Sequence, residues 1–443
     1  MTTNFSPFCC PVCQNLLRGQ VCTKCTSSYP LLDGLPVLLC EPELALADWR
    51  NRWRLERQRL QRDASRAQAG AAKAGDLTRS RLERLAAGYT AQRTAVETVL
   101  APMLANDRGA ARETLLGLRT RLPSHHTPTA YNTHIARDWV WGESENVEAC
   151  QRIESLLGDT KGSLLLPGSG AGRLAFDLGR KRPVMALESN PLLALLSHRL
   201  LKGHAANVVE FPLAPLEPEH VAVTHELSAP RLAHETTVVL ADVLHPPFAA
   251  GSFDAVVTHW LIDVIDCPFS QLVSTINHLL KPGGVWINSG SLAFTAPDLA
   301  LNFSAAEVIE TVERGGYRLE ASAEDDVAYL QSPFSRQSRT ERIFSFRARK
   351  VATTSWKPWV YLPAWLAGDK SSEKEPVPML PAFATQAASV RIHAWLMGMI
   401  DGKRSVADIA AEIARQNLMP PDEATAAVRN FLKVMWEEMQ RSG

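Results

Sequence analysis

The chain has 443 residues, 46% of them hydrophobic and 21% charged, with 47 basic against 47 acidic side chains. That length is too great for one ordinary core, so we expect two or three domains. The balanced charge gives no electrostatic reason to expect nucleic acid as a partner. No apolar run approaches the roughly 20 residues of a membrane helix, and the N-terminus lacks a secretory signal, so we expect a cytoplasmic protein.

Cysteines gather at the N-terminus, where five of the eight lie in the first 25 residues. Two Cys-x2-Cys knuckles supply four thiolates, the tetrahedral set that zinc prefers, with no coordination position left open for chemistry. We predict a zinc ribbon over residues 1–41 that holds a structural Zn²⁺, with Cys9 as the register alternative to Cys10. The predicted ligands are Cys10, Cys13, Cys22 and Cys25. The segment that follows, residues 29–39, resembles the zinc-ribbon protein that activates several tRNA and protein methyltransferases.

Residues 43–122 are rich in arginine, alanine and leucine and poor in glycine and proline, which predicts long helices. An arginine run between Arg50 and Arg62 is interleaved with glutamate and glutamine. That mixture is typical of a solvated helix face rather than of a nucleic-acid surface. We assign residues 42–128 to a helical connector.

From residue 162 onward, short apolar strands alternate with helical stretches. The strands are expected at residues 163–166, 184–187, 237–240, 255–258 and 284–288. Strands separated by helices indicate an α/β fold with a parallel, doubly wound, Rossmann-like sheet. The alternating segment 342–349 predicts a late antiparallel strand. We place this domain at residues 129–352.

The candidate cofactor site follows the first of these strands. Gly168, Gly170 and Gly172 allow a sharp turn and the close approach of a ligand. Glu188 ends the second strand, where a carboxylate can accept the ribose hydroxyls. Asp242 ends the third strand, where it can accept the adenine amino group. The G-x-G-x-G spacing favours adenosylmethionine over a dinucleotide, and no P-loop lysine is present.

Together with Phe253-Asp254 at the fourth strand and Lys281-Pro282-Gly283-Gly284 before the fifth, these blocks resemble the class I S-adenosylmethionine-dependent methyltransferases. Another nucleotide-binding α/β enzyme is the alternative. His245-Pro246-Pro247-Phe248 precedes the fourth strand rather than following it, so we interpret it as a turn beside the adenine and not as the proline motif of a base methyltransferase.

A more specific resemblance covers Tyr131 to Lys350 and is to the carnosine N-methyltransferase family. It rests on Ile135-Ala136-Arg137-Asp138-Trp139, the glycine loop, Trp260-Leu261-Ile262-Asp263 and the block from Leu280 to Gly290. The resemblance implies that the following residues contact the cofactor: Arg137, Gly168, Gly170, Gly172, Arg173, Glu188, Asp242, Val243 and His259. An internal ion pair between Arg137 and Asp138 is the structural alternative.

The same resemblance places Asp263 at the acceptor as the catalytic carboxylate. Where the family has a histidine for the acceptor this chain has Thr295, and where a tyrosine is expected it has Thr340 or Glu341. We therefore take Asp263, Thr295 and Glu341 as the candidate substrate contacts. The expected reaction is transfer of a methyl group to an imidazole nitrogen of a histidine-containing small molecule or peptide, with one carboxylate orienting the ring.

Residues 353–382 read as a linker, and residues 383–443 as a small helical domain. In the latter, Ser405 is a plausible cap for a helix. The segment from Ile400 to Ala410 resembles the small PqqD-like winged-helix modules, which bind leader peptides in peptide-modification pathways. That resemblance implies a leader peptide as partner, and a generic helical cap or dimerisation element is the alternative. For the whole chain, the alternatives are a tRNA or protein methyltransferase and a non-catalytic scaffold with the same fold.

Overall fold

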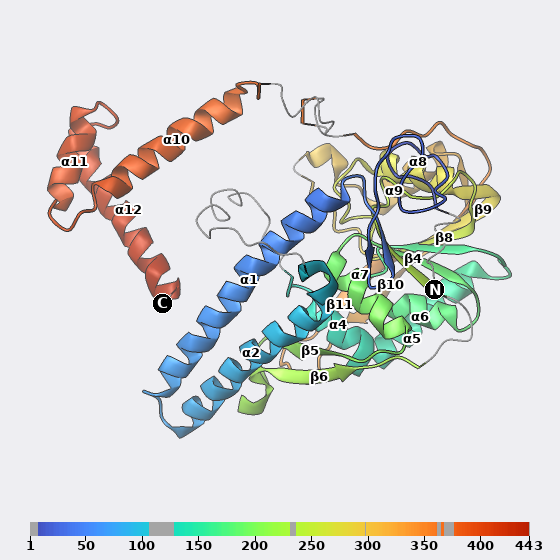
Figure 1. The fold of residues 1–443 in the computed structure, drawn as a ribbon, viewed down its shortest axis with the longest axis horizontal. Coiled ribbons are helices and arrows are strands. Elements are labelled where there is room, and N and C mark those ends of the chain that lie inside the picture. The colour runs from blue at the N-terminus through green and yellow to red at the C-terminus, as the bar shows by residue number, and fades with distance from the viewer. Residues whose placement is uncertain are drawn as a thin grey trace. The chain divides into compact units, whose positions relative to one another are not determined.

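The computed structural model describes residues 8–105, 128–230, 236–296, 298–360, 365–366 and 376–442. The chain forms two compact units, Met1–Trp359 and Val360–Gly443 (Figure 1). The predicted domain boundaries at residues 41 and 128 fall inside the first unit. Residues 106–122, which we predict to be helical, and part of the predicted linker lie outside the described residues.

A nine-stranded sheet forms the centre of the first unit, in the order β1-β2-β7-β4-β3-β8-β9-β11-β10. The pairings from β2 through β9 are parallel, whereas β11 runs antiparallel to both β9 and β10. The order runs outward in both directions from β3, so the sheet is doubly wound with its switch point between β3 and β8. The predicted parallel sheet and the late antiparallel strand are both confirmed. The strands are β1 (Leu31–Leu32), β2 (Leu35–Leu38), β3 (Leu164–Pro167), β4 (Val184–Glu188), β7 (Thr236–Ala241), β8 (Phe253–His259), β9 (Leu280–Gly290), β10 (Tyr317–Tyr329) and β11 (Arg339–Lys350).

The N-terminal segment extends this central sheet. Asp33 and Gly34 have φ of 51° and 82°, as an Asp-Gly type I′ turn requires, and they join β1 to β2 in a hairpin. β2 then lies parallel to β7, with Leu38 in register with Ala241. The cysteine-rich segment and the doubly wound sheet are therefore one continuous structure at this edge.

Both faces of the sheet are covered, because successive side chains of a strand point to opposite faces. Leu164 and Leu166 of β3 belong to one core cluster, while Leu165 between them belongs to the other. The first cluster is completed by side chains of α5, α6 and α7, and the second by side chains of α8, α9 and the N-terminal segment. The helices of this part are α4 (Asn132–Ala136), a π-helix (Arg137–Trp141), α5 (Glu143–Leu157), α6 (Arg173–Gly179), α7 (Pro191–Leu201), α8 (Phe269–Leu279) and α9 (Ala305–Arg314). A second, smaller sheet is the antiparallel pair β5 (Ala206–Glu210) and β6 (Val223–Leu227). Short 3-10 helices lie at Pro218–Val221 and Leu299–Leu301.

Two long helices precede the doubly wound part and pack along each other (Figure 1). They are α1 (Pro42–Ala71) and α2 (Asp76–Leu104). A Cβ added to Gly88 of α2 would lie 2.3 Å from the Cβ of Ala222, so this glycine lets the helix approach the start of β6. The predicted helices of the connector are thus present over its described residues, and they pack on the same unit as the sheet.

The second unit is helical over its described residues. α10 (Pro381–Gly398), α11 (Val406–Arg415) and α12 (Pro421–Ser442) follow one another, and residues 376–442 contain no strand that would form a wing. Ser405 caps α11 in a capping box with Asp408, which confirms the predicted cap. Nowhere in the described parts of the chain is there a helix both long and apolar enough to cross a bilayer.

Candidate functional site

The glycine loop joins β3 to α6 at the switch point of the sheet. Gly168, Gly170 and Gly172 have φ of 66°, 57° and 85°, values that residues with a side chain rarely adopt. A Cβ on Gly168 would lie 2.5 Å from Leu261 Cδ1, and one on Gly172 would lie 2.1 Å from Ser197 Oγ. Around Gly170 nothing lies within 4 Å of the added Cβ. The loop therefore has open space at Gly170 that a ligand can occupy.

Glu188 sits at the end of β4, beside this loop, and is only 6% exposed. Its carboxylate accepts hydrogen bonds from the backbone amides of Gly170 (2.8 Å), Ser189 (2.9 Å) and Asn190 (2.9 Å). Burial raises the pKa of the Glu188 carboxyl, and the three amides oppose that effect. A carboxylate offers about four acceptor positions, so one remains for a ligand while the Gly170 amide stays bound.

Asp242 follows β7, the neighbour of β4 in the sheet. One of its oxygens accepts from the Leu244 amide at 2.9 Å, and the other lies 3.3 Å from His245 Nδ1. Its side chain is 40% exposed, whereas the adjacent Val243 is buried. The two predicted cofactor carboxylates thus end adjacent parallel strands, at the edge where ligands bind in such sheets.

The segment that carries the Arg137-Asp138-Trp139 motif is a π-helix, Arg137–Trp141. Trp139 Nε1 donates to the Ala171 carbonyl of the glycine loop at 2.9 Å. Arg137 donates to Asp138 at 2.8 Å through Nε, so the ion pair that sequence reasoning gave as the alternative is present. Arg173 bonds the Asp138 carbonyl at 2.9 Å and two carboxylates, Glu143 and Asp177. In this structure these side chains join the motif to the glycine loop.

Asp263 lies beyond the end of β8 and is 9% exposed. Its Oδ2 accepts from the Ser291 hydroxyl and from the Ala293 amide at 2.9 Å, both just past β9. Its Oδ1 is buried and has no hydrogen-bond partner. Leu261, two residues earlier, packs over Gly168. The carboxylate is therefore fixed by one oxygen, and its other oxygen has no hydrogen-bond partner in the described residues.

The other two predicted substrate contacts, Thr295 and Glu341, lie on other segments than Asp263. Thr295 is exposed on the segment after β9. Glu341 is on β11, where it pairs with Arg339 at 3.1 Å. Neither contacts Asp263 through a hydrogen bond of the described residues.

Sequence reasoning missed an aromatic group at the ends of β8 and β10. The rings of Trp260 and Tyr329 lie 4.4 Å apart, and His134 Nε2 lies 3.2 Å from the Tyr329 hydroxyl. Trp260 has a φ of 52°, a strained conformation of the kind that functional sites retain. A cavity opens beside this group. Its lining includes Arg137, Glu145, Arg152, His259, Trp260 and Tyr329.

His259, the last residue of β8, is a neutral donor to the backbone. Its Nδ1 lies 2.9 Å from the Ser289 carbonyl. Burial lowers its pKa to about 3, and the charge of Arg137 acts in the same direction. At neutral pH the ring is therefore uncharged and held by its Nδ1–H.

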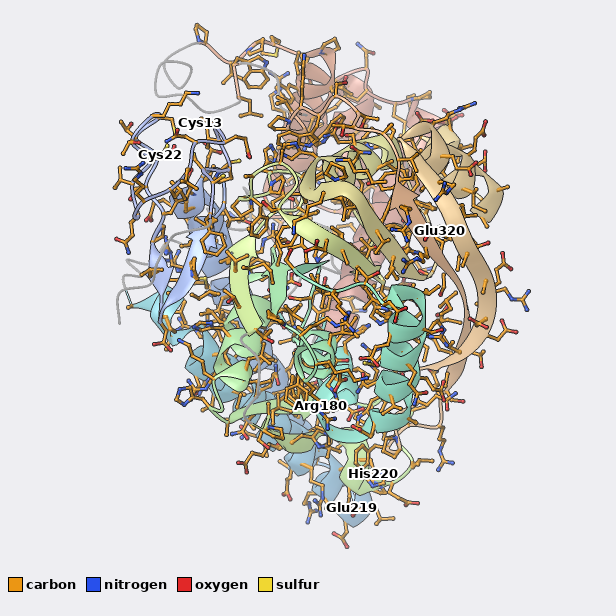
Figure 2. The ribbon with its side chains drawn as sticks, turned by 90° about the vertical axis from the view of Figure 1, so that its right-hand side faces the viewer. Cys13, Cys22, Arg180, Glu219, His220 and Glu320 are labelled. Atoms are coloured by element: carbon orange, nitrogen blue, oxygen red, sulfur yellow. The ribbon has the colours of Figure 1, made fainter. Side chains whose placement is uncertain are left out.

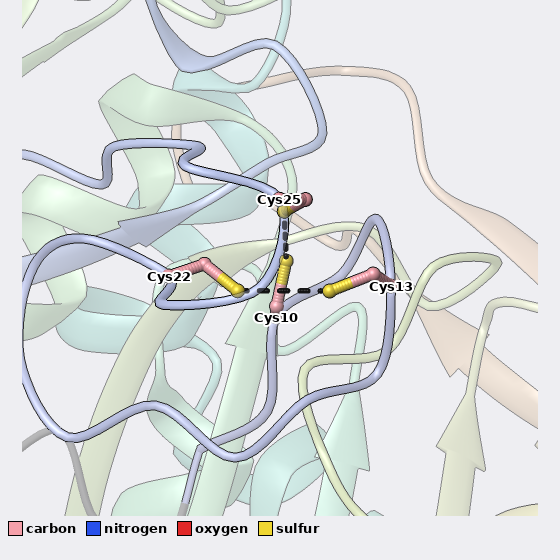
Figure 3. A group of neighbouring side chains, drawn as sticks. All are labelled: Cys10, Cys13, Cys22 and Cys25. Atoms are coloured by element: carbon pink, nitrogen blue, oxygen red, sulfur yellow. Dashed lines mark hydrogen bonds between the residues drawn. The ribbon is translucent and has the colours of Figure 1, made fainter.

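The four predicted metal ligands come together (Figure 3). Their sulfur atoms all lie within 4.8 Å of one another, with 3.4 Å between Cys10 and Cys25 and 3.6 Å between Cys13 and Cys22. A zinc–sulfur bond of about 2.3 Å in a tetrahedron requires about 3.8 Å between sulfurs. The donor set therefore fits zinc, and it contains Cys10 rather than Cys9.

The two knuckles share one local geometry. In each, the residue after the second cysteine has a positive φ, 58° at Gln14 and 60° at Thr26. The hydroxyl of Tyr29 lies 2.9 Å from Cys10 Sγ, where it can donate to a thiolate and orient it. Figure 2 shows Cys13 and Cys22 at the opposite side of the unit from Glu320 of β10, as the positions of β1 and β10 at the two edges of the sheet require.

Part of this chain is similar in sequence to one enzyme family. The family model described as carnosine N-methyltransferase matches residues 219–351. The carnosine N-methyltransferase of Rattus norvegicus is 25% identical over 228 residues, which cover 43% of this chain and 54% of the relative. The Mus musculus protein of the same name matches with the same identity and coverage. The chain thus spans about half the length of the curated relatives it matches.

Solved methyltransferase structures also align with part of the chain. N-methyltransferase NodS from Bradyrhizobium japonicum has a TM-score of 0.33 and 16% identity, covering 47% of this chain and 97% of that one. A possible histamine N-methyltransferase from Thermotoga maritima has a TM-score of 0.29 and 15% identity, covering 49% of this chain and 99% of the other.

Proposed function

We propose that this protein is an S-adenosylmethionine-dependent N-methyltransferase that methylates an imidazole nitrogen of a histidine-containing small molecule or peptide. The observation that carries the proposal is Asp263, whose buried Oδ1 has no partner while Oδ2 is held by Ser291 and Ala293. It stands a few residues beyond the strand next to the glycine loop. The family model that matches residues 219–351 includes Asp263 and supports the acceptor class.

The cofactor pocket is expected at the glycine loop. Gly170 leaves open space for the ligand, and Glu188 has one acceptor position free for a ribose hydroxyl. For Glu188 to accept hydrogen bonds from both ribose hydroxyls, the Gly170 amide must break its 2.8 Å hydrogen bond to Glu188 Oε2. Asp242, more exposed on the adjacent strand end, is the acceptor for the adenine amino group, with Val243 beside it.

The arginine expected at the cofactor carboxylate is Arg137. Its side chain is 14% exposed and lines the cavity beside Trp260 and Tyr329. Binding a ligand carboxylate would use guanidinium donors that Asp138 does not occupy. Arg173, which already bonds three partners, would act by holding the Arg137–Trp141 helix against the loop.

The bound cofactor supplies a methyl group on a positively charged sulfur. A neutral imidazole nitrogen of the acceptor forms the new N–CH3 bond while the C–S bond breaks and its electron pair stays on sulfur. The chain's residues align the ring and exclude water. Asp263 Oδ1 accepts the hydrogen bond from the other ring N–H, which fixes the tautomer, and takes that proton after transfer.

The acceptor itself is set by the surroundings of Asp263. The matched relatives are named for carnosine, but the resemblance puts Thr295 where that family has a histidine, and Thr340 or Glu341 where it has a tyrosine. Tyr329 of β10 pairs with Arg339, two residues before Glu341 on β11, and supplies an aromatic ring from the neighbouring strand. We therefore extend the proposed acceptor to histidine-containing compounds other than carnosine.

The four-cysteine cluster is proposed to hold a structural zinc ion. All four positions of a tetrahedron are filled by Cys10, Cys13, Cys22 and Cys25, which leaves none for water or substrate. Its role is therefore in the architecture of the protein and not in methyl transfer.

The test is to incubate the full chain with methyl-labelled S-adenosylmethionine and, separately, carnosine, free histidine, a histidine-containing peptide and bulk tRNA. Labelled products are identified by mass, with Asp263→Asn protein as the matched control. Label on an imidazole nitrogen, formed at least about ten-fold more slowly by the variant, is the expected result. Label only on tRNA or on another atom would contradict the proposed acceptor, and binding of cofactor without any transfer would favour a scaffold.

A further inference from the structure

We propose that the zinc-loaded cysteine cluster positions the loop that carries the adenine contact, so that metal loading sets the affinity for the cofactor. The loop consists of residues 242–248, from Asp242 to Phe248, and is called here the 242–248 loop. The proposal rests on the proposed function, because it takes Asp242 as a cofactor ligand. It assigns the N-terminal ribbon a positioning role inside the active site rather than a role as a separate module.

The first knuckle contacts the 242–248 loop directly. The backbone amide of Cys9 donates to the Pro247 carbonyl at 2.8 Å, and Gln14 Nε2 donates to the Pro246 carbonyl at 3.2 Å. Cys9 immediately precedes one metal ligand, and Gln14 immediately follows another. The position of both donors is therefore fixed by the conformation of the knuckle.

Apolar packing reinforces these hydrogen bonds. Phe8 forms a β-bridge with Phe248, and the two rings lie 5.8 Å apart. Both are buried, at 2% and 1% exposure. They belong to one core cluster with the ligands Cys10 and Cys22 and with Val243 of the loop. The far end of the 242–248 loop is thus part of the ribbon's own core.

The near end of the loop is tied to the same segment through the sheet. β2 leaves the ribbon and pairs with β7 up to Leu38 and Ala241, the residue before Asp242. Cys40 lies just past β2 and close to Asp242. Burial raises the pKa of the Cys40 thiol, and the charge of the Asp242 carboxylate raises it further. Both ends of the 242–248 loop are therefore bounded by the N-terminal segment.

Regular secondary structure contributes little to the shape of the ribbon. Residues 8–30 contain isolated bridges and turns but no helix and no longer strand. Gln14 and Thr26 hold positive φ angles, which non-glycine residues adopt only where their surroundings impose them. Small metal sites of this kind commonly fold only when the metal is bound. Loss of zinc should therefore release Cys9 and Gln14 from the loop, and Asp242 would lose its fixed position.

The expected effect is a dissociation constant for S-adenosylhomocysteine at least about ten-fold higher, equivalent to about 1.4 kcal/mol. That size corresponds to the loss of one hydrogen bond made by a charged acceptor. Amides of residues 242–248 should also exchange faster with deuterium when the metal is absent, while those of β3 and β4 stay protected.

The experiment measures S-adenosylhomocysteine binding by calorimetry to the full chain in three states: zinc-loaded, stripped with a chelator, and reloaded with zinc. Metal content and hydrogen exchange are measured on the same samples. Gln14→Asn, made as a second variant, retains the metal ligands and tolerates the positive φ, but its shorter side chain does not reach Pro246. Cys150→Ser, on α5 and outside the cluster, is the matched control.

Weaker binding in the stripped protein that is restored by zinc, with an intermediate loss for Gln14→Asn and none for Cys150→Ser, is the predicted result. Unchanged affinity and unchanged exchange of the 242–248 loop after zinc is removed would overturn the proposal, as would purified protein that neither contains nor takes up zinc. If stripping unfolds the whole unit, Gln14→Asn decides: full affinity in that zinc-loaded variant overturns the proposal. Absence of binding to the zinc-loaded wild type would instead refute the proposed function.

Discussion

Replacing Asp263 by asparagine separates acceptor chemistry from cofactor binding. Oδ2 accepts from Ser291 and Ala293, so the amide oxygen of the introduced side chain is expected to take this position. Its NH2 group would then occupy the place of the free Oδ1 and present a donor where the imidazole N–H must be accepted. The substitution preserves the shape of the side chain and removes both the charge and the acceptor.

The magnitude follows from that exchange. One hydrogen bond to a charged group contributes about 1.5–3 kcal/mol, so kcat/KM for methyl transfer should fall by a factor of roughly 10 to 150. The dissociation constant for S-adenosylhomocysteine should change by less than about two-fold, which is under about 0.4 kcal/mol. The melting temperature should fall modestly, because the two hydrogen bonds at Oδ2 lose their charged acceptor and the introduced NH2 group is buried without a partner.

Initial rates at saturating cofactor and calorimetry with S-adenosylhomocysteine measure the two effects. Ser291→Ala, which removes one of the two donors to Oδ2, is the comparison and should lose less activity than Asp263→Asn. Equal losses of rate and cofactor affinity in Asp263→Asn would remove this residue from the acceptor site, and so would full activity.

Two further substitutions test the structure around the site. The folded pKa of His259, about 3, lies below its unfolded value of about 6.5, so the unfolded chain binds the proton first and stability falls as the pH drops through this window. Urea unfolding at pH 7 and pH 5 should show that His259→Asn, which keeps a donor to Ser289, removes about 2 kcal/mol of the wild type's acid destabilisation. Equal pH dependence of both proteins would refute a neutral His259 ring. Trp139→Phe deletes the hydrogen bond to the Ala171 carbonyl and should cost about 1 kcal/mol of unfolding free energy, with faster amide exchange in the glycine loop. Unchanged exchange there would show that the π-helix does not support the loop.

The parts of the fold that sequence predicted are those with a local signal. Short apolar runs predict β3, β4, β7 and β8, and glycine spacing predicts the loop after β3. The Cys-x2-Cys spacing likewise predicts the metal ligands. β10 was missed because most of its residues are exposed on both faces, so no hydrophobic alternation marks it. It is held instead by cross-strand pairs such as Glu320 with Arg347 and Arg349 of β11, which only the register brings together.

Long-range contacts explain what was missing from the candidate site. The pairing of Leu38 with Ala241 joins segments about two hundred positions apart, and β2 and β7 are in register at only two residue pairs. So short a pairing leaves no pattern in the sequence. Tyr329 is held at its place in the aromatic group because β11 returns antiparallel beside β10 and aligns Arg339 with it. The sequence motif identifies Asp263 only as a candidate. That one of its oxygens is held and the other is free depends on Ser291 and Ala293, which follow a different strand.

If the open space at Gly170 receives the cofactor, the methyl group added by Gly170→Ala occupies that space, and titration of S-adenosylhomocysteine into the variant measures the effect. Gly203, which also has a positive φ and open space around its added Cβ, provides the matched control, Gly203→Ala. Both substitutions should cost about 1 kcal/mol of unfolding free energy for the positive φ. The affinity for S-adenosylhomocysteine should fall at least about ten-fold, equivalent to about 1.4 kcal/mol, in Gly170→Ala alone. Wild-type affinity in Gly170→Ala would show that the cofactor does not occupy this space.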